Sequence, residues 1–571
     1  MKSKYTELID RNCPLPEYPR PQLRRDNYKC LNGEWECCFT SASAGAPSKF
    51  DRKILVPFSP ESELSGVGRS LAPNELLWYR RKFTVEQPYA NGNTLLHFGA
   101  VDQTADVYVN GKLATTHVGG YTPFSCNITG FLISGENELV VRVRDITDTG
   151  WQSRGKQRLK RGGIWYTPQS GIWQTVWLEC VPSLYVTSLR IIPDLDDGSV
   201  SVTVHTNRTS DVSISACGKT VSARSSDTAV LKLDSFGEWS PESPTLYDLS
   251  VQAGEDCVTS YFGMRKFEVR PDSSGVNRLF LNNRPYFHTG VLDQGYYSDG
   301  MLTPPCDKAI VDDILLMKSM GFNTLRKHIK MEPLRWYYYC DRLGMLVWQD
   351  MINGGESYKP LTVTAPCFAE GLRIGDHKYS LFGRENADGR RQYYVELYEL
   401  LTNLINCVSI AMWVPFNEGW GQFDAENVVR YIRDIDKTRT IDHASGWHDQ
   451  YIGNTKSLHV YFRPYKFRRD KLNRAVMLTE FGGYSLRIDG HCFCKMTFGY
   501  KEFENNEALL RNFVKLYEEQ IIPAKAKGLC ASIYTQLSDV EDEVNGFVTY
   551  DRAVVKLNPD DVALINSKLR D

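Results

Sequence analysis

The chain has 571 residues, too many for one ordinary hydrophobic core, so we expect three or four domains. It carries 67 basic and 69 acidic residues, a formal net charge of −2, and no long run of either sign. This balance argues against nucleic acid or an anionic membrane as a partner, and no stretch approaches the roughly 20 consecutive apolar residues of a membrane span.

The amino-terminal residues predict no export signal. Residues 1–21, MKSKYTELIDRNCPLPEYPRP, contain neither an apolar core nor a small-residue cleavage site. The 15 cysteines follow no repeating spacing, although the adjacent Cys37 and Cys38 and the Cys492-x-Cys494 pair leave a metal or disulfide interpretation open. We therefore predict a cytoplasmic protein with reduced cysteines, no bound metal and no cofactor.

The first half of the chain is predicted to be all-β. Short apolar or alternating runs such as WYRRKFTV, ADVYVNG and ELVVRVRDI are separated by Gly, Asn, Asp and Pro, and VNGK at residues 109–112 is typical of a tight hairpin. A second series of strands, including VSVTVHT and DVSISACG, runs from about residue 184 to residue 269. The two series predict two β-sandwich domains with a break near Pro182.

The pattern changes after about Pro271, where apolar runs alternate with helical segments such as PLRWYYYCDRLG and AENVVRYIRDID. Eight candidate strands follow in order, YFHTGVL, NTLRK, MLVWQD, IAMWVPFN, TIDHAS, SLHVYF, VMLTEF and CASIYTQ. This alternation predicts a parallel sheet, and the number of strands favours a (β/α)8 barrel. A doubly wound open sheet is the rival, but the first turn, FHTGVLDQGYY, lacks a dinucleotide-binding fingerprint.

Barrel enzymes carry their chemistry where the strands end. Two glutamates follow apolar strands directly, Glu418 after the fourth and Glu480 after the seventh, and these strands lie across the barrel mouth from one another. Paired carboxylates in one cleft suit glycosidic cleavage with retention, in which one is a protonated acid and the other an ionised nucleophile about 5–5.5 Å away. An indole face packs well on a sugar ring, which makes Trp420 and Trp447 candidate partners of the substrate.

Each of these residues also has a structural interpretation. A glutamate after a strand is often a solvated loop residue, and His328 could be a core-edge histidine satisfied by hydrogen bonds. We expect Trp151, Trp165, Trp173 and Trp177 to pack within the first sandwich rather than to bind a ligand.

The residues around the two glutamates resemble a known family. WVPFNEGWGQ and VMLTEFGGYS resemble the acid/base and nucleophile signatures of glycoside hydrolase family 2, the β-galactosidase and β-glucuronidase family. YTPQSGIWQTVWLE, GFNTLRKHIKMEP and TQLSDVEDEVNGFVTYDR agree with this family, and the resemblance covers nearly the whole chain. It implies a jelly-roll sugar-binding domain over residues 1–182, an immunoglobulin-like β-sandwich over 183–271 and a catalytic TIM barrel over 272–571.

The resemblance also implies roles for individual residues. Glu418 matches the acid/base and Glu480 the nucleophile, while Asn417 would hydrogen-bond the sugar 2-hydroxyl. Arg326 would hold the nucleophile ionised, and His328 would face the sugar. The weaker candidates for the wall of the sugar subsite are Asp293, Asp350, Trp447, Tyr461 and Gln536.

One departure from the family pattern and one long loop bear on specificity. The family's glucuronidases carry an Asn-x-Lys element near the last strand, whereas EDEVNGFV here has Asn545 but no Lys, and its acidity would repel a uronate. The long segment 351–385 is expected to shape the pocket. We therefore predict a retaining exo-β-glycosidase acting on a β-linked oligosaccharide or glycoside, with β-galactosidase ahead of β-glucuronidase or β-glucosidase. A catalytically inactive carbohydrate-binding protein is the alternative from another class, and a homo-oligomer is left open.

Overall fold

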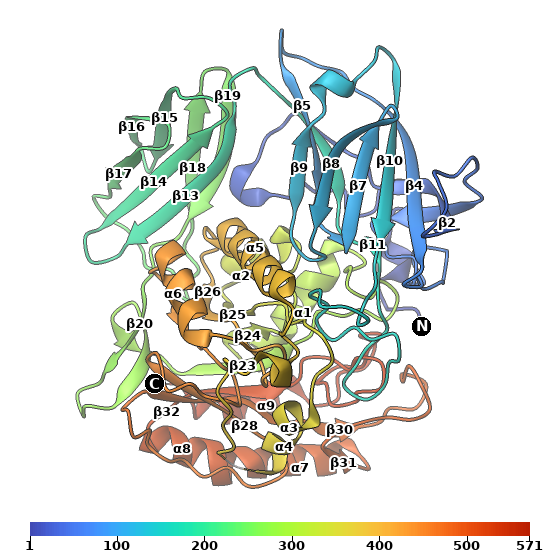
Figure 1. The fold of residues 1–571 in the computed structure, drawn as a ribbon. Coiled ribbons are helices and arrows are strands. Elements are labelled where there is room, and N and C mark those ends of the chain that lie inside the picture. Colours follow the sequence, from blue (N-terminus) through green and yellow to red (C-terminus); the bar gives the residue numbers. More distant parts are fainter. Residues whose placement is uncertain (370, 571) are drawn as a thin grey trace.

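The structure is a computed structural model that describes residues 1–369 and 371–570. Two β-sandwiches lie side by side above a barrel (Figure 1). The first sandwich, formed by residues near the amino terminus, pairs a four-stranded sheet with a six-stranded sheet. The smaller sheet has the order β1 (Tyr28–Cys30), β12 (Val176–Val181), β5 (Asn93–Phe98), β9 (Phe124–Asn127). The larger has the order β3 (Arg52–Val56), β2 (Gly33–Ser41), β4 (Glu75–Thr84), β10 (Glu136–Arg144), β7 (Thr104–Val109), β8 (Lys112–Val118).

Alternating burial explains why these strands form a sandwich. In β10 every second residue is buried, so one face of the sheet packs on the core and the other meets solvent. Trp35, Leu96 and Leu178 come from both sheets and share one apolar cluster. The predicted hairpin is confirmed between β7 and β8, where Asn110 and Gly111 both have positive φ, as a tight two-residue turn requires.

The second sandwich also packs two antiparallel sheets around one apolar cluster. Its three-stranded sheet has the order β13 (Val186–Asp194), β14 (Ser199–Thr206), β17 (Thr228–Lys232). Its four-stranded sheet has the order β16 (Lys219–Arg224), β15 (Asp211–Ala216), β18 (Tyr247–Ala253), β19 (Asp256–Phe262). A small sheet of β20 (Phe267–Pro271), β21 (Asn277–Leu281) and β22 (Arg284–Pro285) then leads into the barrel.

The predicted barrel is confirmed as an eight-stranded sheet in which neighbouring strands pair in parallel. In chain order its strands are β23 (His288–Asp293), β24 (Thr324–Lys327), β25 (Leu346–Asp350), β26 (Ile410–Val414), β27 (Thr440–Ile441), β28 (Thr455–Val460), β29 (Ala475–Gly482) and β32 (Leu529–Thr535). The ring is nearly closed. β27 and β28 do not pair through a backbone ladder, but the Thr455 hydroxyl of β28 donates to the Ile441 carbonyl of β27 at 2.9 Å.

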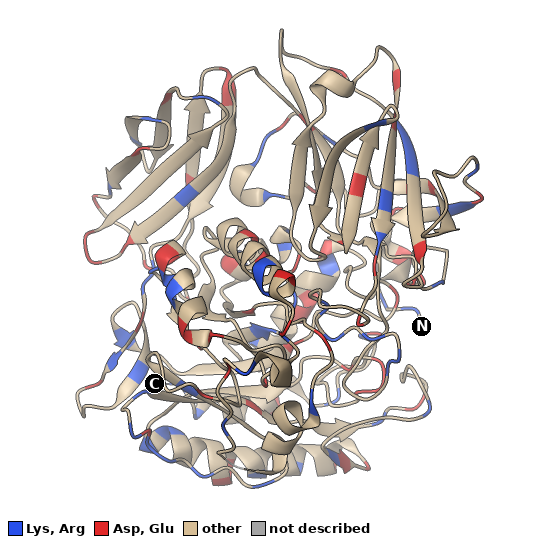
Figure 2. Cartoon of the chain, viewed as in Figure 1, with Lys and Arg blue, Asp and Glu red and all other residues tan. Residues whose placement is uncertain are grey.

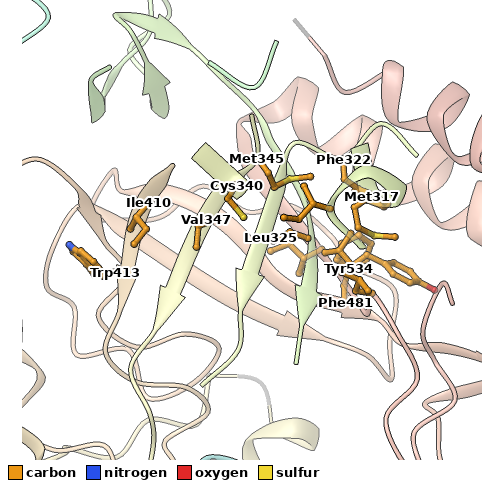
Figure 3. Packing of buried hydrophobic residues seen from close by; sticks show 14 of the residues in the cluster. Met317, Phe322, Leu325, Cys340, Met345, Val347, Ile410, Trp413, Phe481 and Tyr534 are labelled. Atoms are coloured by element: carbon orange, nitrogen blue, oxygen red, sulfur yellow. The ribbon is translucent and has the colours of Figure 1, made fainter. Parts of the chain in front are cut away.

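Helices cover most, but not all, of the barrel. They are α1 (Asp307–Ser319), α2 (Leu334–Leu343), α5 (Ala387–Leu404), α6 (Ala425–Ile435), α7 (Asn506–Leu516), α8 (Ile522–Lys527) and α9 (Pro559–Ser567). In an ideal barrel a helix follows every strand. Residues 442–454, which join β27 to β28, and residues 461–474, which join β28 to β29, contain no helix. Figure 3 shows Leu325, Val347 and Ile410 on neighbouring barrel strands within the largest apolar cluster of the molecule.

A loop of the first sandwich crosses to the barrel mouth. Residues 145–170 leave β10 and return to β11 (Gly171–Ile172), and this teal segment descends onto the barrel in Figure 1. The Arg154 guanidinium donates to the Gly355 carbonyl, and the Tyr166 hydroxyl donates to Glu543. We call residues 145–170 the docking loop.

Charge is spread evenly over the molecule. Figure 2 shows Lys and Arg interspersed with Asp and Glu on the sandwiches and on the barrel alike. Within the described part of the chain, no helix is both long and apolar enough to cross a membrane.

Candidate active site

The first glutamate stands just beyond the fourth barrel strand. β26 ends at Val414, and Asn417 then forms a bridge with Ser445 of the next strand–loop unit. Glu418 has a φ of 50°, in the left-handed region that costs a non-glycine residue about 1–2 kcal/mol. Its N–H donates to the Ser445 carbonyl at 2.9 Å, so the neighbouring loop fixes this conformation and aims the carboxylate.

The second glutamate lies inside the seventh strand. The ladder between β28 and β29 shifts register, so that Leu458 pairs with Leu478 but His459 pairs with Glu480. Thr479 is therefore the extra residue of a β-bulge, a feature that re-aims side chains at barrel rims. The bulge places Glu480 directly beside His459.

Three side chains form a compact cluster at the centre of the mouth. Ligand atoms of Glu418, His459 and Glu480 all lie within 4.8 Å of one another. His459 Nδ1 lies 2.8 Å from Glu418 Oε1 and 3.6 Å from Glu480 Oε2. On its other side, His459 Nε2 lies 3.1 Å from the Ser445 hydroxyl. The predicted glutamate pair thus meets in one place, bridged by an imidazole.

Arg326 organises the Glu480 side of the cluster. Its side chain is fully buried, and two of its N–H groups grip Asp350 at 3.0 Å each. The others donate to Glu480 Oε1 at 3.0 Å, to the side-chain Oδ1 of Asn417 at 2.7 Å and to the backbone carbonyl of Thr479 at 3.2 Å. Because a guanidinium has five N–H donors in a rigid fork, every donor here is used to position a neighbour.

The two carboxylates have opposite pKa shifts. Burial, reinforced by the charge of Glu480, raises the pKa of Glu418 above its ordinary value, although the hydrogen bond from His459 opposes this. For Glu480, burial alone would raise the pKa, but the charges of His459 and Arg326 outweigh it and lower the pKa to about 2. Near neutral pH Glu480 is therefore ionised, while Glu418 is the group of the pair that holds a proton more readily.

Asn417 has a free donor beside the pair. Its carbonyl oxygen accepts from Arg326, which fixes the orientation of the amide. Its buried Nδ2 has no hydrogen-bond partner among the described residues. A buried N–H without a partner costs free energy, so this donor is suited to an acceptor on a bound molecule.

His328 and Asp350 support this arrangement. His328 Nδ1 lies 2.9 Å from the same Asp350 oxygen that Arg326 holds. Burial and the nearby charge of Lys156 lower the pKa of His328 well below its ordinary value, so the imidazole is neutral and its Nδ1–H donates to the carboxylate.

The aromatic candidates fall into two groups. Tyr461 donates its hydroxyl to Glu480 at 2.6 Å, and the half-buried Trp447 lies 6.2 Å from His459 between ring centroids. Trp420 is only 2 % exposed and is enclosed by Trp165 and Tyr358, at centroid distances of 5.0 and 6.4 Å. Trp420 therefore braces the loop of Glu418 more than it offers a free face.

Two predicted wall residues lie apart from this network. Asp293 pairs with Lys327 at 2.6 Å on the outward face of the strands, because Lys327 follows the inward-facing Arg326. Gln536 follows β32, but both ends of its amide are used, by Gln294 and by Asn545 at 2.7 Å each. Neither side chain hydrogen-bonds to the glutamate pair, and their roles as wall residues stay predictions.

The structure adds residues that the sequence patterns did not indicate. His459 was missed, although it lies within β28, two residues before Tyr461, which directly follows that strand. Trp165 was expected to pack within the sandwich, but it contacts Trp420 instead. Lys156 of the docking loop also reaches this region, since its charge acts on both His328 and Glu418.

The same cluster has the composition of a metal site, with two carboxylates and one imidazole. Its atoms, however, already have partners, because His459 bonds Glu418 and the cationic Arg326 lies 3.0 Å from Glu480. A guanidinium in contact with a ligand oxygen opposes a divalent cation, so the residues fit proton transfer better than metal binding.

Comparisons with known proteins identify the family of the chain. Three models of glycosyl hydrolases family 2 match: the sugar binding domain at residues 28–182, a further family 2 domain at 184–265 and the TIM barrel domain at 277–484. The chain is 24 % identical over 408 residues, 64 % of its length and 50 % of the relative's, to a β-galactosidase of Thermoanaerobacter pseudethanolicus. A β-galactosidase of Priestia megaterium is 22 % identical over 83 % of this chain and 46 % of its own length.

Solved structures share the fold over nearly the whole chain. A β-D-glucuronidase of Dictyoglomus thermophilum has a TM-score of 0.74 at 18 % identity, covering 97 % of this chain and 99 % of that one. A family 2 β-galacturonidase of Eisenbergiella tayi bound to galacturonate has a TM-score of 0.71 at 18 % identity, covering 96 % of this chain and 99 % of that one. The chain spans between 34 % and 50 % of the length of the first three curated relatives. The three family models and the order of their domains show that the chain belongs to glycoside hydrolase family 2.

Proposed function

We propose that the protein is a retaining exo-β-glycosidase with Glu480 as nucleophile and Glu418 as acid/base. The observation that carries this proposal is the pair of buried carboxylates with oxygens within 4.8 Å and with oppositely shifted pKa values. That separation suits retention, whereas an inverting pair needs about 6.5–9.5 Å to admit water.

The geometry supports two chemical steps. In the first, a Glu480 oxygen attacks the anomeric carbon as the glycosidic C–O bond breaks, and Glu418 gives its proton to the leaving oxygen. The resulting ester removes the charge of Glu480, one of the groups that raise the pKa of Glu418, so that Glu418 becomes a better base. In the second step Glu418 takes a proton from water, the water oxygen attacks the anomeric carbon, and Glu480 leaves as a carboxylate.

Two classes of sugar are candidates for the substrate. A β-galactoside is the substrate predicted from the sequence, and β-galactosidases are among the relatives. A β-uronide is the second candidate. The chain lacks the Lys of the family's Asn-x-Lys element, but the docking loop brings the ammonium group of Lys156 near Glu418, where it could bind the carboxylate of a uronide.

Lys156 has the features of an anion-binding residue. Only 6 % of the residue is exposed, and no described residue lies within hydrogen-bond distance of its Nζ. The nearest carboxylate oxygen, Glu543 Oε2, lies 3.7 Å away and already accepts from Tyr166. The charge of Lys156 acts on Glu418, and a carboxylate on the sugar would add charge-assisted acceptors for its ammonium group.

The test is hydrolysis of nitrophenyl β-glycosides of galactose, glucose, glucuronate and galacturonate by the full chain, the Glu480→Gln variant and the Lys156→Met variant. Glu480→Gln should lower kcat by about 10⁴-fold or more on every sugar accepted. Near-normal rates in that variant would contradict the mechanism. Lys156→Met should abolish a preference for uronides while Lys160→Met, on the same loop but exposed, leaves it unchanged. An equal effect of Lys156→Met on neutral and anionic sugars would contradict the uronide candidate.

A further inference from the structure

Two cysteine thiols meet where the amino-terminal residues cross the edge of the first sandwich. We call residues 1–27, which precede β1, the arm. Cys13 lies in the arm, and Cys30 is the last residue of β1, the edge strand of the four-stranded sheet. Both side chains are free, partly exposed thiols, and they lie close enough for a hydrogen bond between them. The fold therefore brings together two cysteines from separate segments.

The residues on either side of Cys13 are held against the chain just beyond β1. After Cys13, the Pro14 carbonyl accepts a 2.9 Å hydrogen bond from the Asn32 side chain. Before it, the Asn12 carbonyl oxygen would lie 2.5 Å from a Cβ at position 33, so the approach requires Gly33. Cys13 is thus fixed between two contacts.

Tyr28 of β1 is a neighbour of both thiols. Its hydroxyl donates to the Pro16 carbonyl of the arm at 2.8 Å. Burial, together with the charges of Cys30 and Cys13, raises the pKa of Tyr28, so both thiols lie near this side chain. The arm is therefore held on β1 on both sides of the cysteine pair.

The two thiols differ in how readily they ionise. A hydrogen bond from the Cys30 thiol lowers the pKa of Cys13 to about 7, although burial and the charge of Asp10 oppose this. The same contact, with burial, raises the pKa of Cys30. Every other described cysteine with a shifted pKa is also shifted upward. An attacking thiol works best with a pKa near the ambient pH, and redox-sensor cysteines often have a second, resolving thiol beside them.

We propose that Cys13 and Cys30 form a redox pair that a hydroperoxide converts into a disulfide, which ties the arm to β1. In the first step the Cys13 thiolate attacks one peroxide oxygen and the O–O bond breaks. Cys13 becomes a sulfenic acid, and the released hydroxide takes up a proton to give water. In the second step the Cys30 sulfur attacks the Cys13 sulfur, the S–S bond forms, and the Cys30 proton leaves with the sulfenic hydroxyl as water. The peroxide thus accepts two electrons from the two thiols, and a dithiol reductant reverses the change.

The disulfide would add a covalent link to an arm that already contacts the barrel. The Tyr5 hydroxyl donates to Asp312 of α1 at 3.0 Å, and Arg335 of α2 donates to the Tyr18 carbonyl at 3.2 Å. A cross-link at Cys13 lies in the chain between these two contacts, and a disulfide constrains the unfolded chain, so oxidation should raise the thermal unfolding midpoint. Neither thiol takes part in the proposed glycosidase chemistry, so the redox pair is tested separately from it.

The test treats the full chain with hydrogen peroxide at several pH values, alkylates the remaining thiols and maps the peptides by mass spectrometry without reductant. The expected product is a Cys13–Cys30 cross-linked peptide, lighter than its two parts by two hydrogen atoms and separated by dithiothreitol. Because the thiolate reacts, the rate should rise with pH and level off above the pKa of Cys13, about 7. Cys13 should react at least about tenfold faster than Cys494, which has Cys492 two residues away but a pKa raised to about 11.

Two variants separate the roles of the thiols. In Cys30→Ser, Cys13 should stop at the sulfenic acid, which dimedone traps, and no cross-link should form. In Cys13→Ser, Cys30 should be neither trapped nor cross-linked, because its pKa is raised. In Cys494→Ser, the matched control, the cross-link and the rise in unfolding midpoint on oxidation should both equal those of the wild type.

The wild-type protein alone can overturn the proposal, whether or not the variants fold. Oxidation of Cys13 no faster than that of Cys494 would overturn its role as the attacking thiol. A Cys13 sulfenic acid that persists in the wild type, or a cross-link from Cys13 to another cysteine, would overturn the role of Cys30. A Cys13–Cys30 cross-link with an unchanged unfolding midpoint would overturn the tie between the arm and β1.

Discussion

The imidazole of His459 is predicted to set the pH range in which the two glutamates work. Among the charges that lower the pKa of Glu480, that of His459 has the largest effect, and the hydrogen bond from His459 lowers the pKa of Glu418. We choose the His459→Asn substitution, because the amide nitrogen of asparagine lies about where Nδ1 lies in histidine. The hydrogen bond to Glu418 can then persist while the charge is removed.

The size of the effect follows from the distance to Glu480. At 3.6 Å and an effective dielectric constant of about 20, two unit charges interact by about 4–5 kcal/mol, or about three pKa units. Arg326 remains in contact with Glu480, and water can enter the space left by the smaller side chain, so we expect a rise of about 1–3 pKa units for Glu480. Glu418 loses the same charge, and its pKa should also rise.

The sign of each shift decides what the assay shows. In the proposed mechanism Glu480 is an ionised nucleophile, so kcat/KM falls as pH drops through its pKa. Glu418 is there a protonated acid, so kcat/KM falls as pH rises through its pKa. The wild-type protein should keep its activity to the lowest pH at which it stays folded, because the pKa of Glu480 is about 2. In His459→Asn both limbs of the kcat/KM profile should move to higher pH, measured with the best nitrophenyl glycoside.

The control is His97→Asn, which removes a buried imidazole that stacks on Trp177 in the first sandwich. Its pH profile should match that of the wild type. If the acidic limb of His459→Asn stayed in place, or if His97→Asn moved it equally, the electrostatic role of His459 would be refuted.

Three further predictions concern the same site. Glu418→Ala should retain slow hydrolysis of nitrophenyl glycosides, because their leaving group needs no proton. Added azide should raise this rate, because azide attacks the glycosyl-enzyme ester without the help of a base. Wild-type rates of this variant on alkyl glycosides would contradict the role of Glu418. Dialysis against EDTA should leave kcat/KM unchanged, since Arg326 occupies the place of a cation beside Glu480, and a loss restored by a divalent ion would refute that interpretation. Trp420→Ala should destabilise the protein by about 3–5 kcal/mol, seen as a lower thermal unfolding midpoint than for Trp420→Phe, because Trp420 is enclosed by other rings; an unchanged midpoint would show that its packing contributes little.

Much of the barrel could be predicted because its strands are buried on both faces. β26 and β29 are buried at every position, and such strands appear in the sequence as short continuous apolar runs. The end of each run then marks the catalytic edge of the sheet. Glu418 and Glu480 could be recognised for this reason, as the polar residues that break off two apolar runs.

The remaining site residues depend on register and on contacts between domains. His459 faces Glu480 only because a β-bulge at Thr479 shifts the ladder by one residue, and no local pattern marks this bulge. Asp293 stands at the end of β23, much as Glu418 stands just beyond the end of β26. Asp293 nevertheless turns outward and binds Lys327, because side chains alternate along β24 and the inward position is taken by Arg326. The end of a strand predicts the edge at which a residue lies, but the alternation decides whether it enters the mouth.

The docking loop explains why the first sandwich belongs to the catalytic unit. Trp165 packs on Trp420, two residues after Glu418, and Lys156 is close enough for its charge to act on Glu418. The backbone of the loop is fixed to the barrel as well, since the Arg154 N–H donates to the Asn353 carbonyl at 3.0 Å. Ion pairs of Arg161 with Glu541 and Asp542 hold its far end against the segment after β32. A loop held in this way positions its side chains at the barrel mouth as firmly as a barrel residue, so both the first sandwich and the barrel contribute side chains around Glu418.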